Sequence, residues 1–212
     1  MATPAAFTGN DAAQIDALLE AHPFVTVVTV RDDAPDASHL PVLARRDSVG
    51  LLLEGHWARA NPQAHHGESA LVLVHGPSAY LSADWYPDKH ERARVPTWNY
   101  VVAQLRGRFE RIGDDAALGD LVARTAAHFE PRVGGDWRYD HDDPRERHQL
   151  RGIVGFRFRV ESAAITRKLS QNHPVANRLA VIAALEARPG EAAHAIAAQM
   201  RDGLSCPPDP EP

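Results

Sequence analysis

Short apolar runs separated by turns constrain the fold of this chain more than any other feature of its sequence. The runs Phe24–Val30, Val49–Trp57 and Ala70–His75 are rich in β-branched and aliphatic residues, which is typical of buried strands. Further strands are predicted at residues 37–44, 79–85, 101–112 and 153–160, the last continued by 163–169. Because no strand–helix–strand repeat connects these runs, we predict a mainly β protein, an antiparallel barrel with flanking helices.

The predicted helices lie around these strands. Residues 8–22 form an amphipathic pattern with Ile15, Leu18 and Leu19 on one side, and Gly76–Pro77 predicts a turn. Further helices are predicted at residues 62–66, 114–129, 174–185 and 191–200. We expect three parts: a barrel domain with its N-terminal helix at 1–172, C-terminal helices packed on the barrel at 173–203, and a disordered tail at 204–212.

Composition excludes several classes of protein. The formal net charge of −5 gives no general attraction to nucleic acid or to an anionic membrane. Cys206 is the sole cysteine, so no intrachain disulfide is possible, and the 12 histidines show no metal-ligand spacing, so no metal is predicted. Residues 1–7 do not resemble a signal peptide, and no apolar run approaches the roughly 20 residues of a membrane helix. We therefore expect a cytoplasmic protein without a membrane segment.

The stretch Gly55–Gln63 combines features of a phosphate site. A predicted strand leads through His56, Trp57 and Arg59 to Asn61 and Pro62, which suit the N-cap and first position of a helix. A helix N-terminus and a forked guanidinium both favour an anion, and Trp57 offers a flat surface. This pattern predicts a ligand with an aromatic end and a phosphate end. The alternative is a loop with a surface arginine, a half-buried tryptophan and an ordinary cap.

Four polar and aromatic clusters interrupt the strand pattern. They lie at Ser38–Pro41, Gly55–Gln63, Val95–Tyr100 and Thr166–Asn172, each where a predicted strand ends or is disturbed. Each combines charged or amide donors with apolar neighbours. Ligand pockets have this composition, so we expect these clusters to supply a binding site.

Five motifs in this order carry a resemblance to a known family. They are SHLP, GHWARANPQ, GPSAYLSADWY, VPTWNY and KLSQN, and the resemblance that they carry runs over residues 24–172. In this order and spacing they resemble the FMN-binding negative transcriptional regulators, the PaiB-like proteins. The chain departs from the family at the variable loop Asp88–Arg94 and at Ala83, where the family often has proline. The resemblance implies a split β-barrel like that of flavin reductases and pyridoxamine-phosphate oxidases, and a homodimer with FMN at the subunit interface.

The resemblance also directs the choice of cofactor-binding residues. FMN needs cations and N–H groups for its phosphate, walls for its ring, and donors near the N1–O2 edge, where charge grows on reduction. The phosphate candidates are His56, Arg59 and Asn61. Candidates for the phosphate or the N1–O2 edge are Lys168, Ser170 and Gln171. Ser38, His39 and the backbone of Leu40 are candidates for the polar rim of the ring, and Trp98 and Asn99 for its wall, contributed by the partner subunit.

Three functions remain open from the sequence. The first is a regulator that binds FMN and contacts DNA through a basic patch, whose candidate residues are Arg145, Arg147, Arg151, Arg157 and Arg159. The simpler interpretation of these arginines is an outward barrel face, and no helix-turn-helix is evident. The second is an FMN-dependent oxidoreductase acting on a small molecule, for which no catalytic residue is identified. The third is a barrel that binds haem or another flat anion near His39 or His56.

Overall fold

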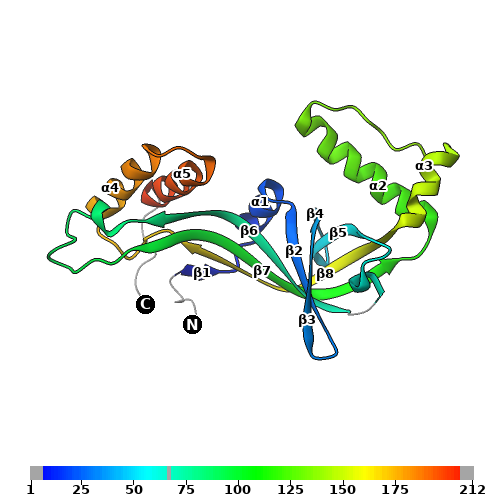
Figure 1. The fold of residues 1–212 in the computed structure, drawn as a ribbon, viewed down its shortest axis with the longest axis horizontal. Helices are drawn as coiled ribbons and strands as arrows, with labels where there is room; N and C mark the ends of the chain where they lie inside the picture. The colour runs from blue at the N-terminus through cyan, green and yellow to red at the C-terminus, as the bar shows by residue number, and fades with distance from the viewer. Residues whose placement is uncertain (1–6, 66–67, 206–212) are drawn as a thin grey trace. The chain divides into compact units, whose positions relative to one another are not determined.

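The computed structural model describes residues 7–65 and 68–205. The chain divides into two compact units. Unit 1 comprises Met1–Asp11, His75–Ala103 and Ala164–Pro212, and unit 2 comprises Ala12–Val74 and Gln104–Ala163. Figure 1 shows the elements of both units, which are described separately below.

Within the described residues, eight strands belong to one sheet, which confirms the mainly β prediction. The strands are β1 (Thr8–Gly9), β2 (Phe24–Arg31), β3 (Ala34–Pro41), β4 (Leu43–Asp47), β5 (Gly50–Ala58), β6 (Ser69–Leu81), β7 (Thr97–Ile112) and β8 (Ile153–Lys168). Their order is β3-β2-β6-β7-β8-β5-β4, with β1 paired to β8. The three central strands β6, β7 and β8 contribute residues to both units.

Unit 2 contains the larger part of the sheet. The β2–β3 hairpin turns at Asp32 and Asp33, whose φ angles of 50° and 62° lie in the left-handed region that such two-residue turns require. β5 pairs antiparallel with β4 and with β8. Alternate residues of β2, such as Val25 and Val27, are buried, as expected for a strand with one face in the core.

Three helices accompany these strands in unit 2: α1 (Ala12–Ala21), α2 (Asp115–Phe129) and α3 (Pro144–Gln149). The short turns η2 (Pro62–His65), η4 (Glu130–Val133) and η5 (Leu150–Gly152) connect the elements. Asp114 caps α2, because its carboxylate accepts a 2.7 Å hydrogen bond from the N–H of Ala117. The apolar side of α2 packs through Leu118 and Leu121 against Ile112 and Leu150.

Unit 1 contains the remaining parts of β6, β7 and β8, the short turn η3 (Ala83–Trp85), and the helices α4 (Val175–Glu186) and α5 (Glu191–Ser205). α4 and α5 lie side by side (Figure 1). They bury Val181, Ile182 and Leu185 of α4 together with Ile196 and Met200 of α5. Of the apolar residues at helical spacing in the predicted helix 174–185, Ile182 and Leu185 lie in the core, whereas Val175 and Leu179 are exposed.

Several element boundaries differ from the predictions. Residues 8–9 form β1, and the predicted helix begins only at Ala12. The Gly76–Pro77 turn is wrong, because β6 continues to Leu81. The two predicted strands after Ile153 are the single strand β8. α5 extends to Ser205, so residues 204 and 205 of the predicted tail are helical, and the rest of that tail, including Cys206, lies outside the described residues.

The division predicted at residue 172 stays a prediction. None of the helices within residues 7–65 and 68–205 has the length and hydropathy that a bilayer crossing requires.

Candidate functional site

Two of the predicted motifs meet in unit 2. The Nδ2 group of Asn61 donates a 2.7 Å hydrogen bond to Oγ of Ser38, which joins the turn after β5 to β3. His39, the next residue of β3, is exposed, and its Nδ1 lies 3.1 Å from Oγ1 of Thr26 on the paired strand. Leu40 is 5% exposed and packs in the core, which leaves its backbone as the part that can meet a ligand. We call Ser38, His39 and Asn61 the Ser38–Asn61 cluster.

The turn beside this cluster is shorter than the helix that the sequence predicts. Asn61 caps η2 as expected, because its Oδ1 accepts from the N–H of Gln63 at 2.9 Å. Its carbonyl also accepts from the N–H of Ala64 at 3.0 Å. The early N–H groups are therefore already bonded, and η2 is a single turn of four residues with little macrodipole. The backbone of this turn thus offers an anion few free N–H groups, and the phosphate roles of Arg59 and Asn61 stay predictions.

Buried Gln63 fixes the turn to the β2–β3 hairpin. Its Nε2 lies within hydrogen-bond distance of the carbonyls of Val27 and Asp36, at 3.2 and 2.8 Å. The same group is 3.0 Å from Oγ1 of Thr29. Because these bonds bridge the hairpin and η2, Gln63 holds Asn61 at its position beside Ser38.

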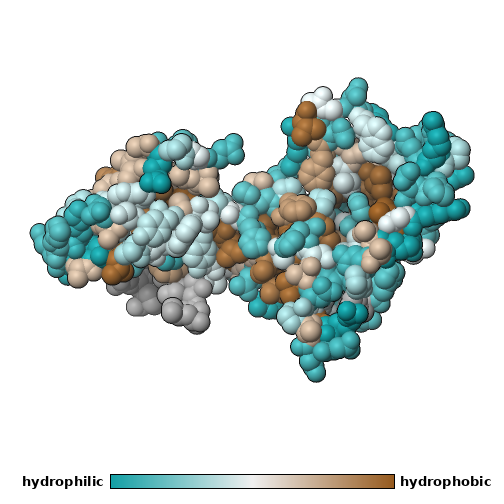
Figure 2. All heavy atoms as spheres, in the orientation of Figure 1, coloured by the Kyte–Doolittle hydropathy of each residue, from teal (hydrophilic) through white to brown (hydrophobic). Residues whose placement is uncertain are grey.

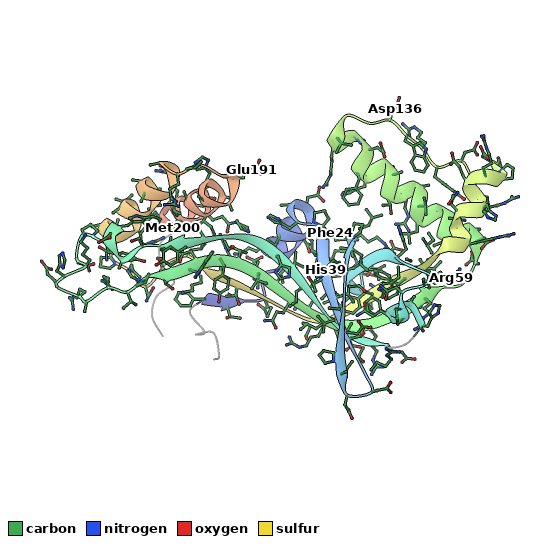
Figure 3. The ribbon with its side chains drawn as sticks, viewed as in Figure 1. Phe24, His39, Arg59, Asp136, Glu191 and Met200 are labelled. Atoms are coloured by element: carbon green, nitrogen blue, oxygen red, sulfur yellow. The ribbon has the colours of Figure 1, made fainter. Side chains whose placement is uncertain are left out.

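Arg59 has a partly structural role. Its Nε donates to the carbonyl of Arg151 at 2.6 Å, and its Nη2 donates to the carbonyl of Ile153 at 2.9 Å. Figure 3 shows Arg59 beyond the end of β5. The remaining nitrogen, Nη1, is the group with which this exposed guanidinium can approach a phosphate.

Trp57 and His56 project to opposite faces of β5. Trp57 is 2% exposed, and its ring packs against Phe109 and Phe156 at centroid distances of 4.8 and 4.4 Å. The prediction that Trp57 offers a surface to a ligand is therefore wrong. The period of two along a strand could have shown this, because Leu53, Gly55 and Trp57 share one face. His56 lies on the other face and lines a pocket, where burial lowers its pKa.

The other two predicted motifs meet in unit 1. The Nζ group of Lys168 donates a 2.5 Å hydrogen bond to Oγ1 of Thr97, and the Oγ of Ser170 donates to Oδ1 of Asn99 at 3.1 Å. Each bond joins residues 71 positions apart in the chain. Asn99 is fully buried, and its Nδ2 contacts Sδ of Met200 on α5 at 3.3 Å. We call Thr97, Asn99, Lys168 and Ser170 the Lys168–Asn99 cluster.

Gln171 follows this cluster in the chain, whereas Trp98 lies between Thr97 and Asn99 on β7, so its side chain points to the opposite face of the strand. Gln171 closes the turn after β8: its Oε1 accepts from the N–H of Leu169 at 2.7 Å, and its Nε2 donates to the carbonyl of Arg167 at 2.5 Å. Ser170, inside this turn, has a φ of 60°. Trp98 is 53% exposed and meets the ring of Tyr80 edge-on at 5.9 Å. Its exposed face is available as a wall for a planar ligand.

A pocket of about 290 Å³ opens at the Lys168–Asn99 cluster. Three cationic side chains line it, from Arg92, Arg94 and Lys168, together with the hydroxyls of Thr97 and Ser170. Arg94 donates to both carboxylate oxygens of Asp88 at 2.9 and 2.5 Å, which lowers the pKa of Asp88 to about 2. This pair neutralises Arg94 locally, so Arg92 and Lys168, beside the hydroxyls, are the cations that suit a phosphate.

Sequence reasoning assigned no role to Arg92, Arg94 or Thr97. Arg92 and Arg94 belong to the variable loop, and Thr97 stands inside VPTWNY. The signal that could have found them is the density of cations immediately before this motif.

Comparison with known proteins identifies the family of this chain. A family model described as "Putative FMN-binding domain" matches residues 1–162. The chain belongs to this FMN-binding family. Within it, the chain is 31% identical to "Protease synthase and sporulation protein PAI 2" of Bacillus subtilis over 208 residues, which cover 96% of this chain and 98% of the relative. The predicted PaiB-like family and the cofactor FMN are thereby confirmed.

Solved structures confirm the fold. The FAD and heme binding protein of Mycobacterium smegmatis superposes with a TM-score of 0.58 at 22% identity, covering 82% of this chain and 78% of that one. The flavocytochrome Anf3 of Azotobacter vinelandii gives a TM-score of 0.57 at 15% identity, covering 76% and 69%. At these identities the likeness shows the fold alone, which is the split β-barrel of this family.

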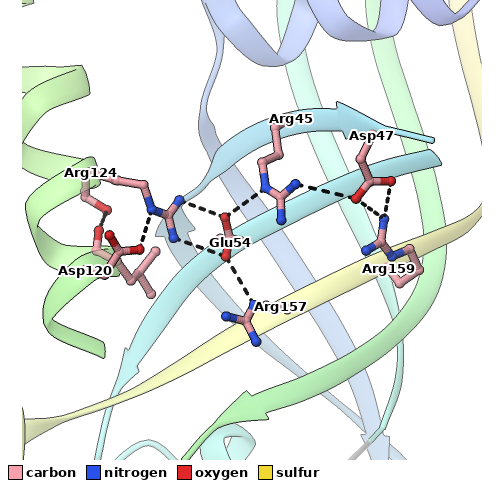
Figure 4. A network of polar contacts seen from close by, with 9 residues as sticks. Arg45, Asp47, Glu54, Asp120, Arg124, Arg157 and Arg159 are labelled. Carbon is pink, nitrogen blue, oxygen red and sulfur yellow. Dashed lines mark hydrogen bonds and ion pairs between the residues drawn. The ribbon is translucent and has the colours of Figure 1, made fainter. Parts of the chain in front are cut away.

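The candidate DNA patch is largely paired with acidic side chains. Arg157 contacts buried Glu54 at 3.4 Å, and Nη1 of Arg159 lies 2.9 and 3.0 Å from the two carboxylate oxygens of Asp47 (Figure 4). Arg145 pairs with Asp143 at 2.6 Å. Pairing neutralises these cations locally, so the patch has less attraction for nucleic acid than its sequence implies.

Proposed function

We propose that this protein is a homodimer that binds FMN at its subunit interface and acts as a negative transcriptional regulator. The family supplies the cofactor, and the resemblance of the five motifs supplies the dimer and the regulatory role. We therefore expect each motif to supply hydrogen-bond donors that bind a different part of one FMN molecule.

The observation that carries the proposal is the pairwise joining of the motifs. SHLP meets ANPQ through Ser38 and Asn61, and VPTWNY meets KLSQN through Thr97 and Lys168. Polar side chains whose only role is to keep the protein soluble would not be expected to form such specific contacts between separate motifs. Hydrogen bonds between them position the donors before a ligand arrives, which reduces the entropy cost of binding.

Each of the two clusters, taken by itself, has chemistry that suits one part of FMN. The pocket with Lys168, Arg92 and Arg94 suits the phosphate, as cations and hydroxyls surround it. Amide and hydroxyl groups of the Ser38–Asn61 cluster suit the polar edge of the ring, and His39 stands exposed beside them. Trp98 offers an apolar face for the ring. Bound FMN supplies electron-transfer chemistry, while the protein binds and orients it.

Titration with FMN tests this assignment. FMN fluorescence should be quenched on binding, and the absorbance spectrum of the complex should show flavin maxima without a Soret band. Lys168→Ala should raise the Kd for FMN about tenfold to a hundredfold, because it removes a charge-assisted hydrogen bond. Lys89→Ala is the matched control, since Lys89 is a surface lysine of the same unit that pairs with Asp84 at 3.0 Å.

The opposite result would remove the phosphate assignment. If Lys168→Ala and Arg59→Ala both leave the Kd for FMN unchanged, neither cation binds the phosphate. The two variants also distinguish the contributions of the two units, because Lys168 belongs to unit 1 and Arg59 to unit 2.

The paired arginines favour a second candidate function, an FMN-dependent oxidoreductase acting on a small molecule. Direct DNA binding needs unpaired cations, and three of the five arginines of the patch, namely Arg145, Arg157 and Arg159, contact carboxylates. Oxidation of NADPH by the FMN-loaded protein would support the oxidoreductase. DNA affinity in a filter-binding assay that falls steeply with salt would support the regulator acting on DNA directly.

A further inference from the structure

Unit 2 contains a pocket that the FMN assignment does not use. It has a volume of about 440 Å³ and is lined by residues of β5, α2, the segment after α2, α3, η5 and the start of β8. Apolar walls come from Val122, Trp137, Tyr139, Leu150 and Ile153. Apolar residues interrupt the hydrophilic surface around α2 in Figure 2. The size and lining are those of a small-molecule pocket.

The wall of this pocket is built by specific contacts. The hydroxyl of Tyr139 lies 3.2 Å from Nδ1 of His141, and the N–H of Asp140 donates to Oε2 of Glu146 at 2.7 Å. The segment also packs tightly on α2, since a Cβ at Gly119 would lie 2.7 Å from His141 and 3.1 Å from Tyr139. Hydrogen bonds and close packing therefore hold Tyr139 and Glu146 at the pocket.

The polar groups of the pocket favour a cation. Its polar lining residues include His56, Glu146 and Gln149. No aspartate, lysine or arginine lines the pocket, so Glu146 carries its one permanent charge, which is negative. Each of the three can accept a hydrogen bond when His56 is neutral. A carboxylate with two further acceptors in an apolar surround is complementary to a protonated amine.

The same charge disfavours FMN as the occupant. The phosphate of FMN needs cations, and neither lysine nor arginine is among the residues that line this pocket. The phosphate-type pocket of unit 1, by contrast, has Arg92, Arg94 and Lys168. The two pockets therefore select ligands of opposite charge.

We propose that the pocket beside His56 binds a small aromatic amine, with its ring between Trp137 and the aliphatic walls and its ammonium at Glu146. A ring fits the apolar walls, and aromatic side chains add favourable ring contacts. An ammonium near Trp137 and Tyr139 also gains cation–π attraction. The proposal assigns His56 to the amine instead of the phosphate of FMN, because no lysine or arginine lines this pocket, and it is tested separately from FMN binding.

Isothermal titration calorimetry with three probes of one shape tests the site. The probes are 2-phenylethylamine, the neutral 2-phenylethanol and the anionic 3-phenylpropanoate, each added to the full-length protein with and without saturating FMN. The amine should bind about tenfold more tightly than the alcohol, which corresponds to one charge-assisted hydrogen bond, and the anion should bind more weakly than either.

Two variants assign the binding to the pocket. Glu146→Gln should remove the preference for the amine over the alcohol, while its amide oxygen can still accept from Asp140. Trp137→Ala should weaken all three probes, and because Trp137 is 47% exposed its removal leaves the core intact. Asp136→Asn is the matched control: Asp136 is an exposed acid of the same segment that does not line the pocket (Figure 3), and its removal should leave the preference unchanged.

Three results would overturn the proposal. They are equal affinity for the amine and the anion, a preference for the amine that persists in Glu146→Gln, and competition between the amine and FMN. The last result would place the amine in the flavin site. Failure of FMN to bind at all would leave the calorimetric result for the amine intact, so the two proposals fail separately.

Discussion

At the scale of single residues, Glu54 is the most heavily contacted charge of unit 2. Its side chain is 2% exposed, and Arg45, Arg124 and Arg157 all contact its carboxylate (Figure 4). The shortest contact, from Nη1 of Arg124 on α2, is 2.8 Å. Burial would raise the pKa of Glu54, but the hydrogen bonds and charges of Arg124 and Arg45 lower it below its ordinary value. A carboxylate in this setting links α2 to strands β4, β5 and β8.

Glu54→Gln should therefore lower the free energy of unfolding. The variant keeps the shape but leaves partly buried arginines without their counter-charge, which we expect to cost about 2 kcal/mol. The control is Asp16→Asn, which breaks an exposed ion pair with Arg46 at 2.8 Å and should cost about 0–1 kcal/mol. Urea denaturation followed by circular dichroism at pH 7 measures both.

The difference in unfolding free energy between wild type and Glu54→Gln should decrease as the pH falls. The pKa of Glu54 is lower in the folded protein than in the unfolded chain, so the carboxylate stabilises the fold above the unfolded value of about 4.5. That contribution is lost as pH falls through the folded pKa. The gap between wild type and Glu54→Gln should thus be full at pH 7 and should shrink below pH 4.5. A gap that stays constant on acidification would contradict the role of the charge.

At the scale of elements, close strand packing makes one glycine of β7 irreplaceable. A Cβ at Gly107 would lie 2.0 Å from the carbonyl oxygen of Arg159 on β8 and 3.1 Å from the ring of Phe158. The nearest obstacle is backbone, which cannot move without disturbing the sheet. Gly55 of β5 is also close-packed, with 2.8 Å to the carbonyl oxygen of Pro41.

Gly107→Ala should destabilise the protein by about 3 kcal/mol, the upper end of typical overpacking costs. Gly113→Ala is the matched control, because a Cβ there meets no atom within 4 Å. The control should be neutral or slightly stabilising, since alanine reduces the entropy of the unfolded chain. Thermal unfolding of both variants gives the comparison, and equal melting temperatures would show that the sheet accommodates the methyl group.

Element positions were predictable from sequence where local pattern decides them. A β-branched run predicted β2, an aliphatic run predicted β5, and apolar residues on one side of residues 114–129 predicted α2. The predicted Gly76–Pro77 turn is wrong because proline, which lacks a backbone N–H, interrupts a strand only where the ladder needs a donor at that position. β2 pairs with β6 only at Leu71–Leu73, so Pro77 lies beyond that ladder.

Site contacts were less predictable than elements, for a physical reason. Motifs reveal which residue types are present, whereas contacts such as Lys168 to Thr97 depend on strand register across 71 positions. Arg59 shows the same limit: its guanidinium donates to backbone carbonyls at Arg151 and Ile153, which a sequence pattern cannot reveal.

At the scale of the whole molecule, the homodimer proposal gives the sharpest expectation. A symmetric dimer has one interface with two equivalent FMN sites, and each site can draw residues from both copies. Asn61 lies in unit 2 and Lys168 in unit 1, so variants at these positions report on different clusters. Sedimentation analysis should first show a species of twice the 23.2 kDa chain mass.

Co-expression of two FMN-deficient variants tests whether one site uses two copies. Lys168→Ala removes a cation, and Asn61→Asp keeps the acceptor for Gln63 but loses the amide donor to Ser38 and adds a negative charge. If each FMN contacts Asn61 of one copy and Lys168 of the other, a mixed dimer has one intact site and one doubly altered site. Random pairing would then restore about one quarter of the sites.

The recovery is measured as FMN bound per chain, at a concentration that saturates wild type but neither variant alone. Mixing the two purified variants without subunit exchange is the control and should restore nothing. If co-expressed dimers of confirmed mixed composition show no recovery of FMN binding, every FMN site must carry one of the two substitutions. FMN would then be bound within single chains, and the interface placement would be wrong even if FMN binding itself is retained by wild type.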